Sequence, residues 1–178
     1  MSTQREAVIT TQDKTKELVI DALFIALTFA ATMFINIRLP LMGNGGLIHL
    51  GIVPMFLGAF IFGKRTGALA GGIGMGLFDL SAGWTAWAPF TLVIVGLMGY
   101  VSGLISENLK VRPIIANTVA VIAALIIKIA GYYLTEGILF GNWVAPLGSI
   151  PGNIIQVATA GVIVIPLAGK LKQIAERH

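Results

Sequence analysis

Six apolar runs, separated by short connections, leave this chain few ways to fold. They extend over roughly residues 16–36, 49–62, 66–81, 89–105, 113–133 and 150–171. A membrane-spanning helix needs about 20 predominantly apolar residues, and 178 residues have room for six such helices and little else. The sequence therefore predicts an all-α integral membrane protein with six transmembrane helices in a single domain. The second run is short and contains Pro54, so we expect it to be kinked, tilted or partly shielded by protein.

The composition supports this class and excludes several functions. Hydrophobic residues make up 56% of the chain and charged residues only 11%, which is far more apolar than a soluble domain. Because the chain has no cysteine, disulfides, thiol catalysis and cysteine metal sites are excluded. Its two histidines, His49 and His178, lie far apart in the sequence, so we expect no metal site. The sequence contains no phosphate-binding loop and no catalytic triad, which favours binding or transport over catalysis and predicts no cofactor.

Positive charges orient the predicted bundle. Ten of the twelve lysines and arginines fall on the side of the termini: Arg5, Lys14, Lys16, Lys64, Arg65, Lys110, Arg112, Lys170, Lys172 and Arg177. Arg38 falls on the opposite side, and Lys128 lies within a run. Since such residues concentrate in cytoplasmic connections, both termini are predicted to face the cytoplasm, with the helices in the cell membrane. Because topology explains the basic residues, no nucleic acid partner is expected. We expect a cytoplasmic tail over residues 1–15, the membrane domain over residues 16–174 and a second tail over residues 175–178.

Small residues four apart predict close helix packing in several of the runs, including the fourth with Gly99 and Gly103. The third run has two such rows, made of Gly67 and Gly71 and of Ala68, Gly72 and Gly76. The first run has one row, made of Ala22, Ala26 and Ala30. Small side chains let helix backbones approach closely in a membrane. The alanine row is therefore a docking surface for another helix, and periodicity leaves open whether that helix belongs to this chain or to a partner.

Ionisable residues inside the runs indicate a functional site. Asp79 follows Arg65 and Lys128 follows Pro113 by a similar number of residues, so both are expected at a similar depth in the outer part of the membrane. A buried charge without a partner is costly, so the two groups either neutralise each other or hold a polar ligand together. Lys128, Tyr132 and Glu136 are four apart, which puts an ammonium, a phenol and a carboxylate on one helix face.

Tryptophan and amide side chains add to this site on the outer side. Trp84, Trp87 and Trp143 suit either anchoring at the membrane interface or stacking on a flat heteroaromatic solute. His49 is interpreted as an interfacial hydrogen-bonding group. The candidate substrate-binding residues are Asn44, His49, Asp79, Trp84, Trp87, Lys128, Tyr132, Glu136, Asn142, Trp143, Asn153 and Gln156.

The chain resembles the substrate-binding S components of energy-coupling factor (ECF) vitamin transporters over nearly all six runs. The resemblance is carried by the alanine row, by the segment GLIHLGIVPMFLGAFIFGKRTGALAGGIGMGLFDL and by WAPFTLVIVGLMGYVSGLI. It is similar above all to the riboflavin-transporter-like branch, whose members include proteins assigned to hydroxymethylpyrimidine or pyridoxine. The short loops, with an Asp and a Lys inside the membrane, favour these small rings over riboflavin.

The resemblance implies a function that the residues alone do not give. S components bind a vitamin on the outer side, and their alanine face docks on a shared transmembrane coupling protein driven by two ATPases. The docking residues would be Ala22, Ala26 and Ala30, and ligand contacts would come from Asn44, Trp87, Lys128, Tyr132, Asn153 and Gln156. The residues alone also allow a stand-alone channel or facilitator with Asp79 and Lys128 along its path. A membrane enzyme using Asp79 or His49 as acid or base is a third hypothesis.

Overall fold

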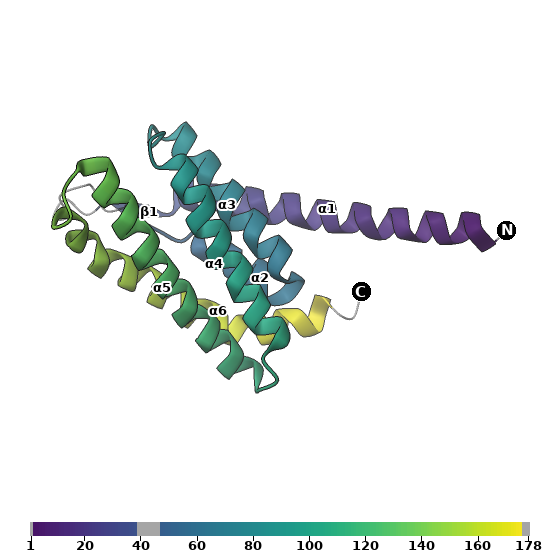
Figure 1. The fold of residues 1–178 in the computed structure, drawn as a ribbon. Helices are drawn as coiled ribbons and strands as arrows, with labels where there is room; N and C mark the ends of the chain where they lie inside the picture. Colours follow the sequence, from purple (N-terminus) through teal and green to yellow (C-terminus); the bar gives the residue numbers. More distant parts are fainter. Residues whose placement is uncertain (1, 39–46, 176–178) are drawn as a thin grey trace.

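The computed structural model describes residues 2–38 and 47–175, which form a helical bundle with a two-stranded hairpin (Figure 1). The α-helices of these residues are α1 (Ser2–Phe34), α2 (Ile52–Phe62), α3 (Lys64–Ser81), α4 (Ala88–Asn108), α5 (Pro113–Phe140) and α6 (Ile150–Ala175). Strands β1 (Asn36–Arg38) and β2 (Leu47–His49) lie between α1 and α2, and a short 3₁₀ helix, η1 (Ala145–Ser149), precedes α6. The predicted all-α class is confirmed in its main feature.

Among the described residues, four helical segments are long and apolar enough to cross a membrane: Asp13–Phe34, Ala88–Asn108, Pro113–Phe140 and Ala145–Lys172. The exterior of the bundle is correspondingly apolar, since Val93, Ile126 and Val162 are between 63% and 75% exposed. An exterior this apolar is typical of a surface that contacts lipid. A bilayer crossing by all six helices, and the side on which the termini lie, stay predictions.

Helix α2 is the buried centre of the bundle. Its side chains Ile52, Met55 and Phe56 are fully buried in a core shared with α4, α5 and α6. An 11-residue helix is too short to span a bilayer alone, but protein covers this one on several sides. Pro54 stands in its first turn, where the missing backbone N–H breaks no helical hydrogen bond. The prediction that the second run is shielded by protein is confirmed.

Glycines bring α3 and α4 together at backbone distance. A Cβ on Gly99 would collide with the carbonyl oxygen of Gly67, and a Cβ on Gly72 would lie 2.8 Å from the carbonyl oxygen of Leu92. Gly74 meets α1 in the same way, 2.9 Å from the carbonyl oxygen of Ile25. The small-residue spacing of the third run therefore predicted its packing correctly.

The sequence analysis did not predict the hairpin of β1 and β2. β1 and β2 are antiparallel, with Ile37 opposite Ile48 and Asn36 opposite His49. Asn36 was expected at the end of the first helix and His49 at the start of the second, and both expectations are wrong. Isoleucine raises the hydropathy of a strand as much as that of a helix, so an apolar run does not distinguish the two. Asn44 lies outside the described residues.

Two helix boundaries also differ from expectation. The fifth run was expected to end at residue 133, but α5 continues to Phe140. Within this added part the Thr135 hydroxyl donates to the carbonyl of Gly131 (2.9 Å), so it is satisfied inside the helix. The helix ends at Gly141, which adopts the left-handed conformation (φ 61°, ψ 21°). The other boundary lies between α2 and α3, where Gly63 (φ 96°) interrupts the helical path. Lys64 and Arg65, which precede the third apolar run, therefore belong to the start of α3.

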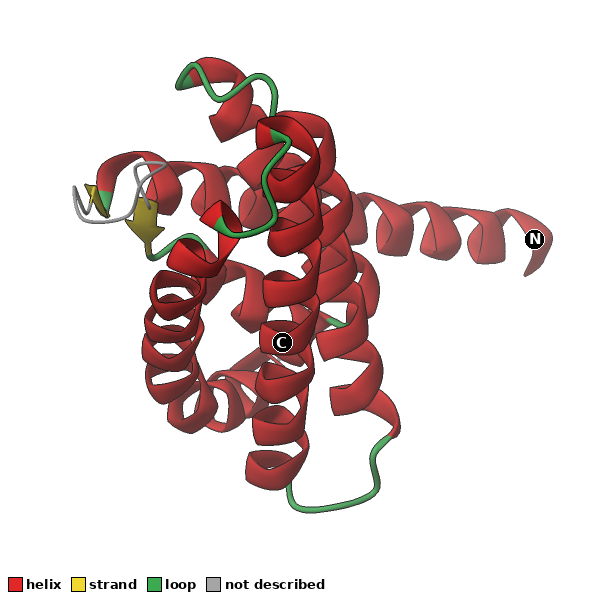
Figure 2. Cartoon of the chain, turned by 60° about the vertical axis from the view of Figure 1, so that its left-hand side comes forward, coloured by secondary structure: helices red, strands yellow, loops and turns green. Residues whose placement is uncertain are grey.

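The bundle has two distinct ends. The hairpin end carries β1, β2 and the connections that follow α3 and α5, whereas the basic end carries the α2–α3 and α4–α5 connections with Lys64, Lys110 and Arg112 (Figure 2). Helix α1 begins and α6 ends on one side of the molecule, and the first half of α1 extends beyond the other helices (Figure 1). Residues 2–15, predicted as a tail, belong to α1.

Candidate functional site

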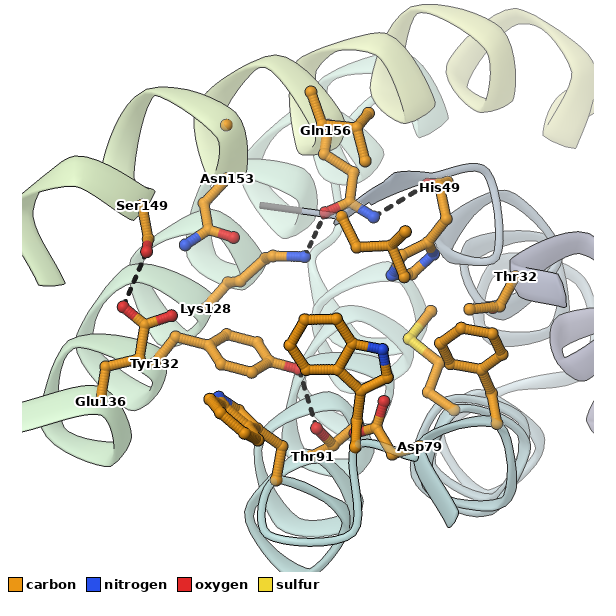
Figure 3. A pocket seen from close by; sticks show the side chains of 17 residues that line it. Thr32, His49, Asp79, Thr91, Lys128, Tyr132, Glu136, Ser149, Asn153 and Gln156 are labelled. Atoms are coloured by element: carbon orange, nitrogen blue, oxygen red, sulfur yellow. Dashed lines mark hydrogen bonds between the residues drawn. The ribbon is translucent and has the colours of Figure 1, made fainter. Parts of the chain in front are cut away.

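A cavity of about 110 Å³ opens at the hairpin end, between α1, β2, α3, α4, α5 and α6 (Figure 3). Nine of the predicted binding residues line it: His49, Asp79, Trp84, Trp87, Lys128, Tyr132, Glu136, Asn153 and Gln156. They come from several different segments of the chain. The fold thus gathers into one place most of the polar and aromatic residues that the sequence distributes over more than a hundred positions.

One face of α5 supplies three of these groups, as their spacing predicted. Lys128, Tyr132 and Glu136 lie on successive turns and all reach the cavity. Lys128 is 3% exposed and Glu136 is 8% exposed, so both ionisable groups are removed from water. The Glu136 carboxylate accepts a hydrogen bond from the Ser149 hydroxyl (2.7 Å), which joins α5 to η1.

The Lys128 ammonium is held by neutral groups. Its Nζ donates to Oε1 of Gln156 at 2.6 Å and lies 5.5 Å from the centre of the Tyr132 ring. Within the described residues no carboxylate oxygen lies within 4.0 Å of Lys128, so it forms no ion pair with Asp79 there. A direct ion pair of Asp79 with Lys128, one of the two arrangements that the sequence allowed, is therefore not found there, and the joint binding of a ligand stays a prediction.

Gln156 links Lys128 to the hairpin. Its Nε2 donates to the carbonyl of His49 (2.8 Å), which turns Oε1 towards Lys128 and fixes the amide orientation. The His49 Nδ1 atom is buried and has no hydrogen-bond partner among the described residues. Burial holds the pKa of His49 well below its ordinary value, and the Lys128 ammonium lowers this pKa further, so the imidazole is neutral at pH 7.

The opposite wall combines acid, hydroxyl and indole groups. The Thr91 hydroxyl and the Tyr132 phenol share a hydrogen bond of 3.1 Å, close to Asp79 near the end of α3 (Figure 3). Trp84 and Trp87 meet edge to face with ring centres 5.3 Å apart, and Trp87 also packs 5.8 Å from Phe140. These contacts hold the two indoles as an aromatic wall of the cavity.

Two predicted binding residues lie elsewhere. The Asn142 side chain accepts the backbone N–H groups of Val144 (2.8 Å) and Ala145 (3.3 Å), and so stabilises the start of η1. Trp143 is 51% exposed and packs on Tyr133, whose hydroxyl donates to the Trp143 carbonyl (3.0 Å). Neither residue lines the cavity.

The sequence analysis missed further lining residues: Thr32, Leu47, Ile48, Met75, Phe78, Thr91, Ser149 and Gly152. Thr91 follows Trp87 by four residues, and Phe78 precedes Asp79, so helical spacing and adjacency were signals for these two. Ser149 carried no such signal, because the 3₁₀ helix that presents it was not expected.

The alanine row lies apart from the cavity, on α1. Ala22 and Ala26 are exposed and Ala30 is half-buried, whereas Phe24 and Thr28 on another face of α1 are buried. In the described residues Ala22 and Ala26 thus leave a smooth surface open. No three His, Asp or Glu side chains in the same residues come together as a metal site would require.

Comparison with known proteins agrees with this geometry. A profile of the family "ECF-type riboflavin transporter, S component" matches residues 12–173. The thiamine precursor transporter HmpT of Lactococcus lactis subsp. cremoris is 30% identical over 149 residues, which cover 83% of this chain and 82% of that protein. An uncharacterized protein in the gap 3′ region of Pyrococcus woesei is 32% identical over 131 residues, covering 72% of this chain and 83% of the relative.

A solved structure shares the fold. That structure, described as "Structure and mechanism of the S component of a bacterial ECF transporter", superposes on this one with a TM-score of 0.74. The match covers 91% of this chain and 98% of the other at 20% sequence identity.

Proposed function

Because the chain belongs to the family of S components of ECF-type riboflavin transporters, we propose that it binds a single-ring vitamin precursor, hydroxymethylpyrimidine, for uptake by an ECF importer. Members of this family are membrane transport proteins rather than enzymes. The proposal concerns the substrate, the residues that hold it and the way in which the importer assembles.

The observation that carries the substrate proposal is the buried Lys128 ammonium with neutral partners, facing carboxylates across a small aromatic-walled cavity. A ring nitrogen or hydroxyl oxygen of a pyrimidine would accept from Lys128, and its exocyclic amine would donate to Asp79 or Glu136. The ring would stack against Trp84 or Trp87. These groups, with His49, Tyr132, Asn153 and Gln156, form the proposed site.

Cavity size and ancestry favour the pyrimidine over riboflavin. Riboflavin has three fused rings and a sugar-alcohol chain, and a small cavity of about 110 Å³ suits a single ring better. The relative from Lactococcus lactis carries the name of a thiamine precursor transporter, and hydroxymethylpyrimidine is the pyrimidine part of thiamine. Pyridoxine is a second candidate, because Asp79 and Glu136 would accept hydrogen bonds from its hydroxyl groups.

The assembly follows the family pattern. In this proposal all six helices belong to the membrane domain, the termini are cytoplasmic, and Ala22, Ala26 and Ala30 dock on a transmembrane coupling protein that works with two ATPases. The exposure of Ala22 and Ala26 supports this role, since a smooth helix face permits close contact with another helix.

Calorimetric titration of the purified protein with hydroxymethylpyrimidine, pyridoxine and riboflavin tests the substrate. We expect the tightest binding for hydroxymethylpyrimidine and none for riboflavin. Tight riboflavin binding without pyrimidine or pyridoxine binding would overturn the proposal.

Uptake measurements test the assembly against a stand-alone facilitator. Ala26→Leu should abolish uptake by the reconstituted importer and leave solute binding intact, because a bulky side chain blocks close docking. Passage of the solute into liposomes that contain this chain alone would instead favour the facilitator.

A further inference from the structure

A buried carboxylate ties α1 to α3 near the basic end, far from the cavity. Asp21 is 4% exposed, and its Oδ1 accepts a hydrogen bond from the Thr66 hydroxyl at 2.7 Å. Its Oδ2 accepts no hydrogen bond among the described residues but forms an ion pair with Arg65, whose Nε lies 3.3 Å away. Nη1 of Arg65 also lies 3.0 Å from Oε2 of Glu17. One guanidinium therefore serves two acids that stand four residues apart on α1.

The cost of burying Asp21 fixes the direction in which this side chain points. A buried carboxylate is strongly destabilising unless its oxygens are paired, and the partners of Asp21 come from the first turn of α3. Gly63, with φ 96°, sets where that turn begins. Asp21 must consequently face α3.

An α-helix turns about 100° per residue, so one fixed side chain determines where every other face of α1 points. Phe24 and Thr28 fall on buried faces, and Ala22 and Ala26 fall on an exposed one. Further along, α1 meets α3 at Gly74, where the buried Thr28 side chain and the Ile25 carbonyl approach the glycine backbone. The polar contacts of Asp21 and Glu17 add directional partners to this apolar packing.

We propose that Asp21, held by Arg65 and Thr66, is a positioning residue that fixes the rotation of α1 and thereby keeps Ala22 and Ala26 turned outward. The partner that uses this face is the coupling protein, and that part rests on the proposed function. The rotational setting itself is independent of any partner.

Spin labels measure the rotation directly, because the chain has no cysteine and accepts a single labelled pair. The pair Ala22→Cys and Leu104→Cys joins exposed positions on α1 and α4. Asp21→Ala should shift or broaden the label-to-label distance by on the order of 5 Å, the radius of a helix with its side chains. Thr66→Val removes only the hydrogen bond and should produce a smaller broadening.

Lys64→Met is the matched control. Lys64 forms an ion pair with Glu107 (3.5 Å) that joins α3 to α4 at the same end of the bundle, and within the described residues the ion pairs to α1 come from Arg65 and not from Lys64. This variant should keep the label distance of the parent protein. If Asp21→Ala is not recovered folded, Thr66→Val is compared with Lys64→Met by the same criteria.

Co-purification with the coupling protein and ATPases provides the functional result. Asp21→Ala should reduce the amount of assembled importer at least fivefold, while the affinity of the isolated chain for hydroxymethylpyrimidine stays within twofold of the parent. Parental distances and assembly in Asp21→Ala, or an equal loss in Lys64→Met, would overturn the proposal. If the parent binds no hydroxymethylpyrimidine but the label distances change as expected, the substrate proposal fails and the rotational role of Asp21 stands.

Discussion

Helices α3 and α4 meet backbone to backbone, whereas α5 and α6 are joined beside a cavity by polar side chains. In the first pair Gly67 and Gly99 leave no room for a single added carbon atom. In the second, Lys128 and Gln156 span the gap with a hydrogen bond of 2.6 Å. Both contacts lie within one small helical bundle, but they depend on opposite kinds of residue.

The difference reflects what a membrane demands of each contact. Lipid tails are as apolar as leucine, so two helices gain most by approaching closely through small residues. Polar groups in the same surroundings have no water and bind one another until a ligand replaces those contacts. We infer that the glycine contact between α3 and α4 holds the shape of the bundle and that the polar side chains around the cavity, including those of α5 and α6, recognise the solute. Substitutions on the two sides should therefore have separable effects.

The largest separable effect is expected for Lys128→Met, which keeps the side-chain length and removes the charge. A hydrogen bond from a charged group contributes about 1.5–3 kcal/mol, so the affinity for hydroxymethylpyrimidine should fall roughly 10- to 100-fold. Calorimetry measures this loss, and Lys170→Met, at an exposed position of α6, should leave the affinity unchanged. Equal affinity in the parent and Lys128→Met would remove Lys128 from the site.

Gly99→Ala should lower stability, because it changes the close contact between α3 and α4. Its methyl group collides with the Gly67 carbonyl, and such overpacking costs about 1–3 kcal/mol. The thermal unfolding midpoint in detergent should fall, while the solute affinity of the folded protein is retained. Gly169→Ala meets no atom within 4 Å and should not lower the midpoint. If Gly99→Ala lowered the solute affinity without lowering the unfolding midpoint, the proposed separation of structural and binding roles would be wrong.

A smaller effect is expected from Thr91→Val. The substitution keeps the shape of a buried side chain but removes the hydroxyl that orients the Tyr132 phenol. One neutral hydrogen bond contributes about 1 kcal/mol, so the affinity should fall roughly fivefold with little change in stability. Thr118→Val, which removes a hydroxyl bonded only to its own helix among the described residues, is the control and should bind normally.

The close packing of the third run was readable from the sequence, although its partner α4 was not, because spacing by four shows which small residues share a face. The same spacing placed Lys128, Tyr132 and Glu136 together. Hydropathy gave the membrane class, because it depends only on composition along short segments, whereas the orientation from the charge count stays a prediction.

What the sequence could not give depends on contacts between segments. Ser149 reaches Glu136 because a 3₁₀ helix turns there, and Gln156 reaches His49 across 107 residues because a hairpin forms. Asn142 looked like a ligand-binding amide, but its oxygen is used by the backbone of its own turn. Asp21 and Arg65 are ordinary charges in the sequence, and only the fold buries one beside the other.

The central claim is that the cavity holds a single-ring precursor. Its most direct test is to identify the solute that leaves the protein on denaturation. Purified parent protein and Lys128→Met would be denatured, and the released small molecules identified by mass spectrometry. We predict that hydroxymethylpyrimidine is released by the parent and is at least tenfold depleted in Lys128→Met. Release of riboflavin by the parent, or of equal amounts of the pyrimidine by both proteins, would contradict the claim.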